Sequence, residues 1–144
     1  MTLAPEVVVQ ATGHPEERHH HRHVLLQAGQ VIADFSSLSV AQTQQLAAQA
    51  ASRQTTWIDS PVSGGTAGAE QGTLVIFAGG DAQAIDSLSL IYNVLSQRVT
   101  RMGATGAGQA TKICNQLIVA ANSALIAEAV ALAGKAGVDT RLLA

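Results

Sequence analysis

Residues 55–80 read TTWIDSPVSGGTAGAEQGTLVIFAGG and contain two apolar runs on either side of a glycine-rich turn. The first run, TTWIDS (55–60), predicts a strand that must end near Pro61, because proline cannot donate a ladder hydrogen bond. The second run, TLVIFAGG (73–80), predicts another strand. The fold class follows from these two strands together with the elements around them.

Upstream of these strands, the sequence continues to alternate between strands and helices. QVIADFSS (30–37) is typical of a buried strand, and SVAQTQQLAAQAASR (39–53) of a helix that Ser39 can cap. The apolar run EVVVQA (6–11) is compatible with a further short strand.

Downstream, AQAIDSLSLIYNVLS (82–96) predicts a helix with Asp81 as its cap, and RVTRM (98–102) predicts a short strand. Strands that alternate with helices indicate an α/β fold with a parallel-type sheet.

One long helix then follows, from Gln109 to about Ala136, and Gly137 occupies the position where a C′ glycine ends a helix. Crossover helices usually have about 10–15 residues. We therefore expect this helix to leave the sheet and to begin a second, helical domain, of which residues 109–144 are only the start.

Composition excludes several classes of protein. The chain has 144 residues, enough for one domain or a piece of two, and it is too apolar for a disordered segment, with 47% hydrophobic and 12% charged residues. A net charge of −2 and few aromatic residues argue against nucleic acid as a partner. A single cysteine, Cys114, excludes an internal disulfide and a cysteine-cluster metal site, and it is compatible with a cytoplasmic protein.

Two further segments could suggest a metal site or a membrane span, but their residues favour neither. All five histidines (His14, His19, His20, His21 and His23) lie in the unassigned stretch 1–23, where no regular ligand frame indicates a metal site. Residues 113–133 have the length of a membrane span, but five polar or charged residues interrupt them, which favours a helix buried between protein layers and no membrane partner.

Two polar clusters could carry chemistry. In DSPVSGG (59–65), the hydroxyl of Ser63 and the backbone N–H groups of Gly64 and Gly65 suit a small carboxylate, although an ordinary serine–glycine turn has the same residues.

Lys112 lies near the start of the long helix, with Asn115 and Gln116 three and four residues further on the same face. It could exchange a proton with a ligand that the amides orient, or it could simply extend its ammonium group into water.

The glycine run GATGAG (103–108) does not match a nucleotide-binding loop. Gly106 and Gly108 are followed by Thr111, where the dinucleotide fingerprint needs glycine or alanine, and no G-x-G-x-x-G occurs in the chain. The run is more simply explained as the turn into the long helix.

Four segments, in this order and at these spacings, resemble the β-hydroxyacid dehydrogenase family over roughly residues 24–144. They are VIADFSSLS, DSPVSGGTAGAEQGTLVIFAGG, RMGATGAGQATKICNQ and AEAVALAGKAGVD. The resemblance implies a partial Rossmann-like NAD(P)-binding domain at 24–108, followed by the start of a helical C-terminal domain for dimerisation and substrate binding at 109–144.

The resemblance also implies an activity, the NAD- or NADP-dependent interconversion of a small β-hydroxy acid and its semialdehyde or ketone. By carry-over, Ser63, Gly64 and Gly65 would bind the substrate carboxylate, and Lys112 would be the general acid and base. Ser37 would lie against the nicotinamide side of the cofactor.

The polar partner of the lysine, usually asparagine in this family, falls on Gln116, with Asn115 just before it, which leaves the exact role of the amide open. The resemblance further implies a homo-oligomer that forms through the helical domain.

Two alternatives remain open at this point. Because the glycine fingerprint is absent, the chain could be a non-catalytic fragment or a dimerising module of such an enzyme. It could also be related to reductases that act on imines, although those typically lack the lysine. The sequence specifies neither the hydroxy acid nor the choice between NAD and NADP.

Overall fold

The computed structural model describes residues 7–10 and 27–143, so the histidine-rich stretch lies outside the described residues. The chain divides into two compact units, Met1–Lys112 and Ile113–Ala144. The first unit contains the sheet and its helices. The second consists of the larger part of the long helix and a short 3₁₀ turn.

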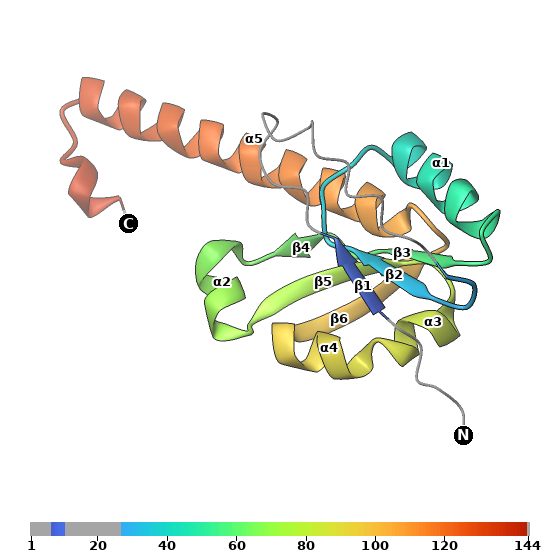
Figure 1. Ribbon diagram of the computed structural model, residues 1–144. Coiled ribbons are helices and arrows are strands. Elements are labelled where there is room, and N and C mark those ends of the chain that lie inside the picture. Colours follow the sequence, from blue (N-terminus) through green and yellow to red (C-terminus); the bar gives the residue numbers. More distant parts are fainter. Residues whose placement is uncertain (1–6, 11–26, 144) are drawn as a thin grey trace, which may run out of the picture. The chain divides into compact units, whose positions relative to one another are not determined.

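The strands of the first unit form one mixed sheet (Figure 1). β1, β2 and β3 are parallel neighbours, whereas β5 is antiparallel to β3 and β4 and parallel to β6. The strands are β1 Val7–Gln10, β2 Val31–Asp34, β3 Thr56–Asp59, β4 Val62–Ser63, β5 Leu74–Gly79 and β6 Ser96–Gly103.

The change of direction at β5 has its origin in the glycine-rich segment. β3 and β4 pair with β5 in one continuous register, and the Phe77 N–H donates to the Pro61 carbonyl between them at 3.0 Å. Only residues 64–73, which include the seven-residue helix α2, Gly65–Gln71, separate β4 from β5. A parallel return needs a crossover of about a dozen residues or more. The predicted parallel sheet is therefore wrong at this junction and right on either side of it.

Both predicted helix caps are confirmed. Ser39 caps α1, Val40–Ala51, in a capping box with Gln42, and Asp81 caps α3, Ala82–Ser87, by accepting from the Ala84 N–H at 2.9 Å. The single helix predicted at 82–96 is instead two helices, because the backbone bends at Leu88 before α4, Ser89–Leu95.

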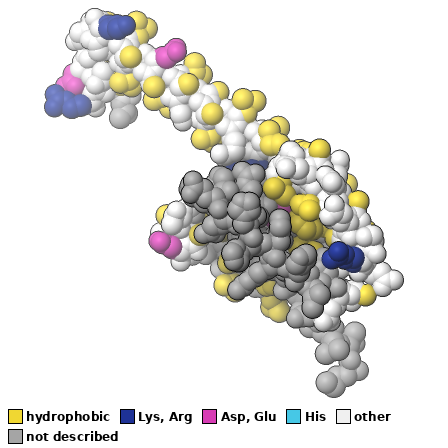
Figure 2. All heavy atoms as spheres, turned by 45° about the horizontal axis from the view of Figure 1, so that its top comes forward, with side chains coloured by type: hydrophobic (Ala, Val, Ile, Leu, Met, Phe, Trp, Pro, Cys, Tyr) yellow, Lys and Arg dark blue, Asp and Glu magenta, His cyan; other side chains and the backbone are white. Residues whose placement is uncertain are grey.

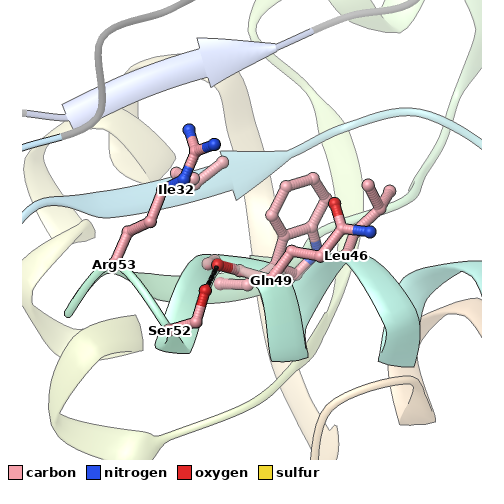
Figure 3. Close-up of a pocket in the computed structure, with 7 residues that line it drawn as sticks. Ile32, Leu46, Gln49, Ser52 and Arg53 are labelled. Carbon is pink, nitrogen blue, oxygen red and sulfur yellow. Dashed lines mark hydrogen bonds between the residues drawn. The ribbon is translucent and has the colours of Figure 1, made fainter.

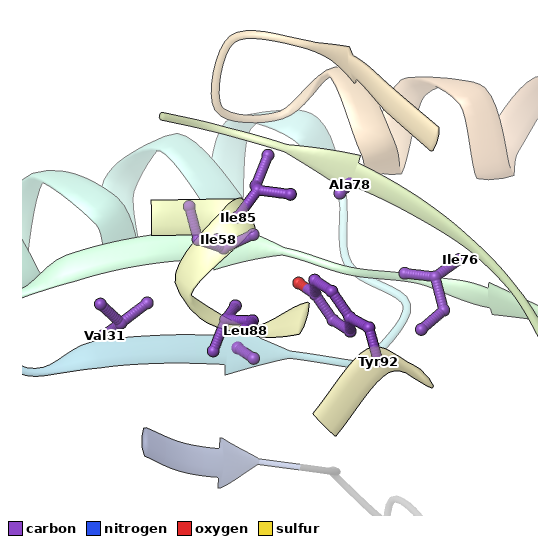
Figure 4. Packing of buried hydrophobic residues seen from close by; sticks show 8 residues of the cluster. Val31, Ile58, Ile76, Ala78, Ile85, Leu88 and Tyr92 are labelled. Atoms are coloured by element: carbon purple, nitrogen blue, oxygen red, sulfur yellow. The ribbon is translucent and has the colours of Figure 1, made fainter. Parts of the chain in front are cut away.

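Apolar residues form a core on each face of the sheet, because successive side chains of a strand point to opposite sides. Trp57 and Ile32 pack against α1 on one face. On the other face, Ile58 and Ile76 pack against Ile85, Leu88 and Tyr92 of α3 and α4 (Figure 4).

The long helix α5, Ala107–Lys135, confirms the predicted helix, and Gly137 follows its end at the C′ position with a φ of +81°. The Val138 N–H donates to the Ala133 carbonyl, which completes a Schellman cap.

Apolar side chains lie along the exposed surface of this helix (Figure 2). α5 is long and apolar enough to span a membrane by length and composition, and none of its most apolar window is buried within the described residues, so the burial predicted for 113–133 is not observed. The most exposed of its apolar residues are Leu117, Ile118, Leu125, Ile126 and Leu132.

A buried carboxylate anchors the start of α5 to the end of β3. Asp59 is fully buried, and its two oxygens accept from the backbone N–H groups of Gly106 at 2.8 Å and Gln109 at 3.0 Å. Gln109 lies in the first turn of α5 and Gly106 directly precedes it, and this turn has no acidic residue of its own. A negative charge here also complements the helix dipole. The approach is close, since a Cβ on Gly108 would lie 2.2 Å from the Phe77 carbonyl oxygen.

A second aspartate lies beside the first, because β2 pairs with β3 so that Asp34 is the register partner of Asp59. One Asp34 oxygen accepts from the Ser36 N–H at 3.1 Å and from the Ser36 hydroxyl at 2.5 Å. The other oxygen is buried without a partner among the described residues. Burial raises the pKa of Asp34, the bonds from Ser36 oppose this, and the nearby Asp59 carboxylate adds to the rise.

Asp59→Asn should lower the free energy of unfolding by about 2 kcal/mol, because an amide nitrogen would leave one backbone N–H of the α5 turn unpaired. Urea unfolding of the variant and the wild type measures this change. Asp86→Asn removes an exposed carboxylate of α3 and serves as the control, with little effect expected. Equal unfolding midpoints for Asp59→Asn and the wild type would contradict the anchoring role.

Asp34→Asn should remove a pH dependence of stability. Above the ordinary value of 3.8, the unfolded chain loses the Asp34 proton while the folded chain keeps it, so the contribution of Asp34 to stability falls as pH rises through the higher folded pKa. Melting temperatures of variant and wild type should therefore diverge with rising pH, with the variant more stable near neutrality. A difference that stays constant over this range would exclude the effect.

Candidate functional site

The loop after β2 is held against the first turn of α5 by one side chain. Gln109, which is 1% exposed, donates from Nε2 to the Ser36 carbonyl at 2.7 Å. Its Oε1 accepts from the Leu38 N–H at 3.2 Å. The carboxyl ends of β2 and β3 and the start of α5 are thus joined by hydrogen bonds, at the edge of the sheet where open α/β folds bind ligands.

Ser37 lies between the two residues that Gln109 holds. Its side chain is exposed, and its hydroxyl forms no hydrogen bond with the described residues. The backbone at this position is therefore fixed while the hydroxyl is available to a ligand.

Ser63, Gly64 and Gly65 form the transition from β4 into α2. Ser63 ends β4 opposite Val75, and the two glycines begin the helix with φ values of +127° and +62°. Both conformations strongly favour glycine. No side chain of the described residues comes within 4 Å of the Cβ position of Gly65, so its backbone is open to a small ligand.

Lys112 lies in the second turn of α5, three residues after Gln109. Its side chain is half-buried and forms no ion pair or hydrogen bond with the described residues, so its ammonium group is free to interact with a ligand.

Asn115 and Gln116 follow in the same helix but belong to the second unit. The Asn115 amide nitrogen donates to the Gln116 side-chain oxygen at 3.3 Å.

Of the predicted site residues, the structure connects Ser37 and Lys112, which are linked through Gln109. No hydrogen bond of the described residues joins Lys112 directly to Ser63, Gly64 or Gly65. Gln109 and the two buried aspartates are not among the predicted site residues. Asp59 begins the DSPVSGG segment and Gln109 starts the predicted helix, but nothing in their spacing indicates that they bond to each other.

The structure also has a half-open cavity of about 260 Å³ on the α1 face of the sheet (Figure 3). None of the predicted site residues lines it. Its walls include Leu46, Gln49, Ser52 and Arg53 from α1 and the turn after it, together with Ile32 and Trp57 from the sheet.

Two family models match the chain. Residues 9–103 match the NAD-binding domain of 6-phosphogluconate dehydrogenase. Residues 106–144 match the NAD-binding domain of NADP-dependent 3-hydroxyisobutyrate dehydrogenase.

Individual proteins agree with these matches. 2-hydroxy-3-oxopropionate reductase of Escherichia coli (strain K12) is 40% identical over 111 residues, which are 77% of this chain and 38% of that enzyme. The structure of Mycobacterium tuberculosis 3-hydroxyisobutyrate dehydrogenase with L-serine aligns with a TM-score of 0.76 and 34% identity, over 78% of this chain and 39% of that one. Psf3 in complex with NADP+ and 2-OPP aligns with a TM-score of 0.79 and 25% identity, over 95% of this chain and 50% of that one.

The chain thus spans about two fifths of the length of the curated relatives that it matches. The matched residues include the strand–turn segment and the start of α5. The α/β fold of the first unit and the long helix that follows it agree with the solved structures. The chain belongs to the β-hydroxyacid dehydrogenase family.

Proposed function

We propose that this chain carries the substrate-binding and proton-transfer residues of an NAD(P)-dependent oxidoreductase that interconverts a small β-hydroxy acid and its semialdehyde or ketone. The observation that supports this most directly is the attachment of the Lys112 helix to the loop of Ser37. Asp59 and Gln109 bond the start of α5 to the end of β3 and to the loop after β2. The helix that carries Lys112 is therefore fixed to the loop that carries the exposed Ser37.

In this proposal the substrate carboxylate binds the Ser63 hydroxyl and the N–H groups of Gly64 and Gly65. These groups are hydrogen-bond donors on exposed glycines, and the space around the Cβ position of Gly65 is open, which suits a small anion. Asn115 and Gln116 then orient the hydroxyl or carbonyl oxygen of the substrate.

When bound, the reduced nicotinamide supplies a hydride to the carbonyl carbon. The Lys112 ammonium donates a proton to the carbonyl oxygen, which yields the alcohol. In the reverse direction the neutral amine accepts that proton. The exposed Ser37 hydroxyl fits the nicotinamide end of the cofactor, whereas the chain has no glycine fingerprint for the pyrophosphate.

A second candidate function is a non-catalytic fragment or a dimerising module of such an enzyme. The missing fingerprint and the exposed apolar residues of the second unit favour it. A homo-oligomer formed through this helical region and a cytoplasmic location stay predictions in either case.

Titration of the chain with NADH and NADPH separates the two candidates. Trp57 is the single tryptophan, so energy transfer from it to the reduced nicotinamide reports binding directly. Saturable transfer with one cofactor is expected for the oxidoreductase. A folded chain that shows no transfer with either cofactor would instead be a non-catalytic fragment.

Lys112→Met should lower turnover of 3-hydroxyisobutyrate or 2-hydroxy-3-oxopropionate by about a thousandfold, because general acid–base catalysis typically contributes about 10² to 10⁴. The dissociation constant of the cofactor should stay within about twofold, since this lysine acts on the substrate oxygen. Lys135 is the only other lysine and is exposed, so Lys135→Met is the matched control. Turnover retained in Lys112→Met would rule out the proton-transfer role.

A further inference from the structure

We infer that Gln109 is a positioning residue whose side-chain amide holds the backbone on both sides of Ser37 against the first turn of α5. The expected effect of Gln109 on cofactor binding rests on the proposed function. The inference assigns Gln109 no contact with substrate or cofactor.

The amide of Gln109 acts as a strand residue would. In a parallel ladder, one residue donates its N–H to the residue before its partner and accepts from the residue after it. Gln109 makes the same pair of bonds with its side chain, since Nε2 donates to the Ser36 carbonyl and Oε1 accepts from the Leu38 N–H. Ser37 is the residue enclosed by these two bonds.

Gln109 is itself held firmly. Its backbone N–H donates to Asp59 at 3.0 Å, and its side chain is almost completely buried. One residue therefore connects the end of β3 through its backbone and the loop after β2 through its side chain. Lys112 follows three residues later, about 4.5 Å along the helix axis at 1.5 Å per residue.

The arrangement leaves the Ser37 hydroxyl free while both neighbouring backbone groups are bonded. A side chain that only filled space or stabilised the loop would not need both a donor and an acceptor at this position. Glutamine supplies both, leucine of similar size supplies neither, and an ionised glutamate cannot donate. These differences make the role testable.

The first measurement is amide hydrogen exchange at Leu38 in the ¹⁵N-labelled chain. Gln109→Leu should expose this amide and increase its exchange rate at least about tenfold, because the rate follows local opening. Gln83→Leu, at an exposed position of α3, is the matched control and should leave the rate unchanged.

Gln109→Glu adds a readout that a merely structural role would not produce. When protonated, the introduced carboxyl group can donate to the Ser36 carbonyl and accept from the Leu38 N–H. When ionised, it cannot donate and repels the Ser36 carbonyl oxygen, so the side chain should be displaced and Leu38 protection should fall as pH rises. The ionisable groups around this position are Asp59, bonded to the Gln109 backbone, Asp34, bonded to Ser36, and Lys112 on the same helix. The wild type measured over the same pH range corrects for them.

The second measurement is titration with NADH and NADPH. Gln109→Leu should weaken binding by about tenfold, since a displaced Ser37 hydroxyl would no longer hydrogen-bond to the cofactor. If the wild type binds neither cofactor, the proposed function fails, and exchange at Leu38 alone decides the role of Gln109.

Unchanged Leu38 exchange in Gln109→Leu, or cofactor binding as tight as in the wild type, would overturn the inference. If Gln109→Leu does not fold, the pH dependence of Gln109→Glu gives the same decision.

Discussion

The buried carboxylate of Asp59 is the constraint on which the rest of the first unit depends. A helix that starts inside a protein has backbone N–H groups without intrahelical partners, and these must be satisfied. Asp59 satisfies two of them, at Gly106 and Gln109, and adds a negative charge at the positive end of the helix dipole. Because the helix start is fixed in this way, Gln109 reaches the loop after β2, and the helical turn that carries Lys112 has a defined position.

The sheet changes direction at the segment that carries the proposed carboxylate site. Pro61 interrupts the strand, yet its carbonyl still accepts from Phe77, so β3 and β4 follow one edge of β5. The short helix α2 then begins at two glycines with positive φ, where other residues would be strained. The same geometry that reverses the chain therefore leaves the N–H groups of Gly64 and Gly65 accessible.

Much of this fold could be predicted from local patterns. A strand within 30–37, the caps Ser39 and Asp81, and the C′ glycine Gly137 are all confirmed, although β2 covers only Val31–Asp34, because each depends on residues within one turn or strand. The bend at Leu88 and the helix α2 were not predicted. Packing of Leu88 in the core decides the bend, and the pairing of β4 with β5 positions α2. Neither feature is indicated by a local sequence pattern in its own segment.

The sequence by itself determined the alternation of strands and helices, the length of α5 and, through its linked motifs, the family. Only the tertiary structure decided the direction of β5, the burial of Asp34 beside Asp59, and the bond from Gln109 to Ser36. The partners in these contacts are separated by long stretches of chain, 50 residues for Asp59 and Gln109 and 73 for Gln109 and Ser36. Local periodicity describes which face a side chain occupies, whereas contacts at such separations exist only after the sheet has been assembled.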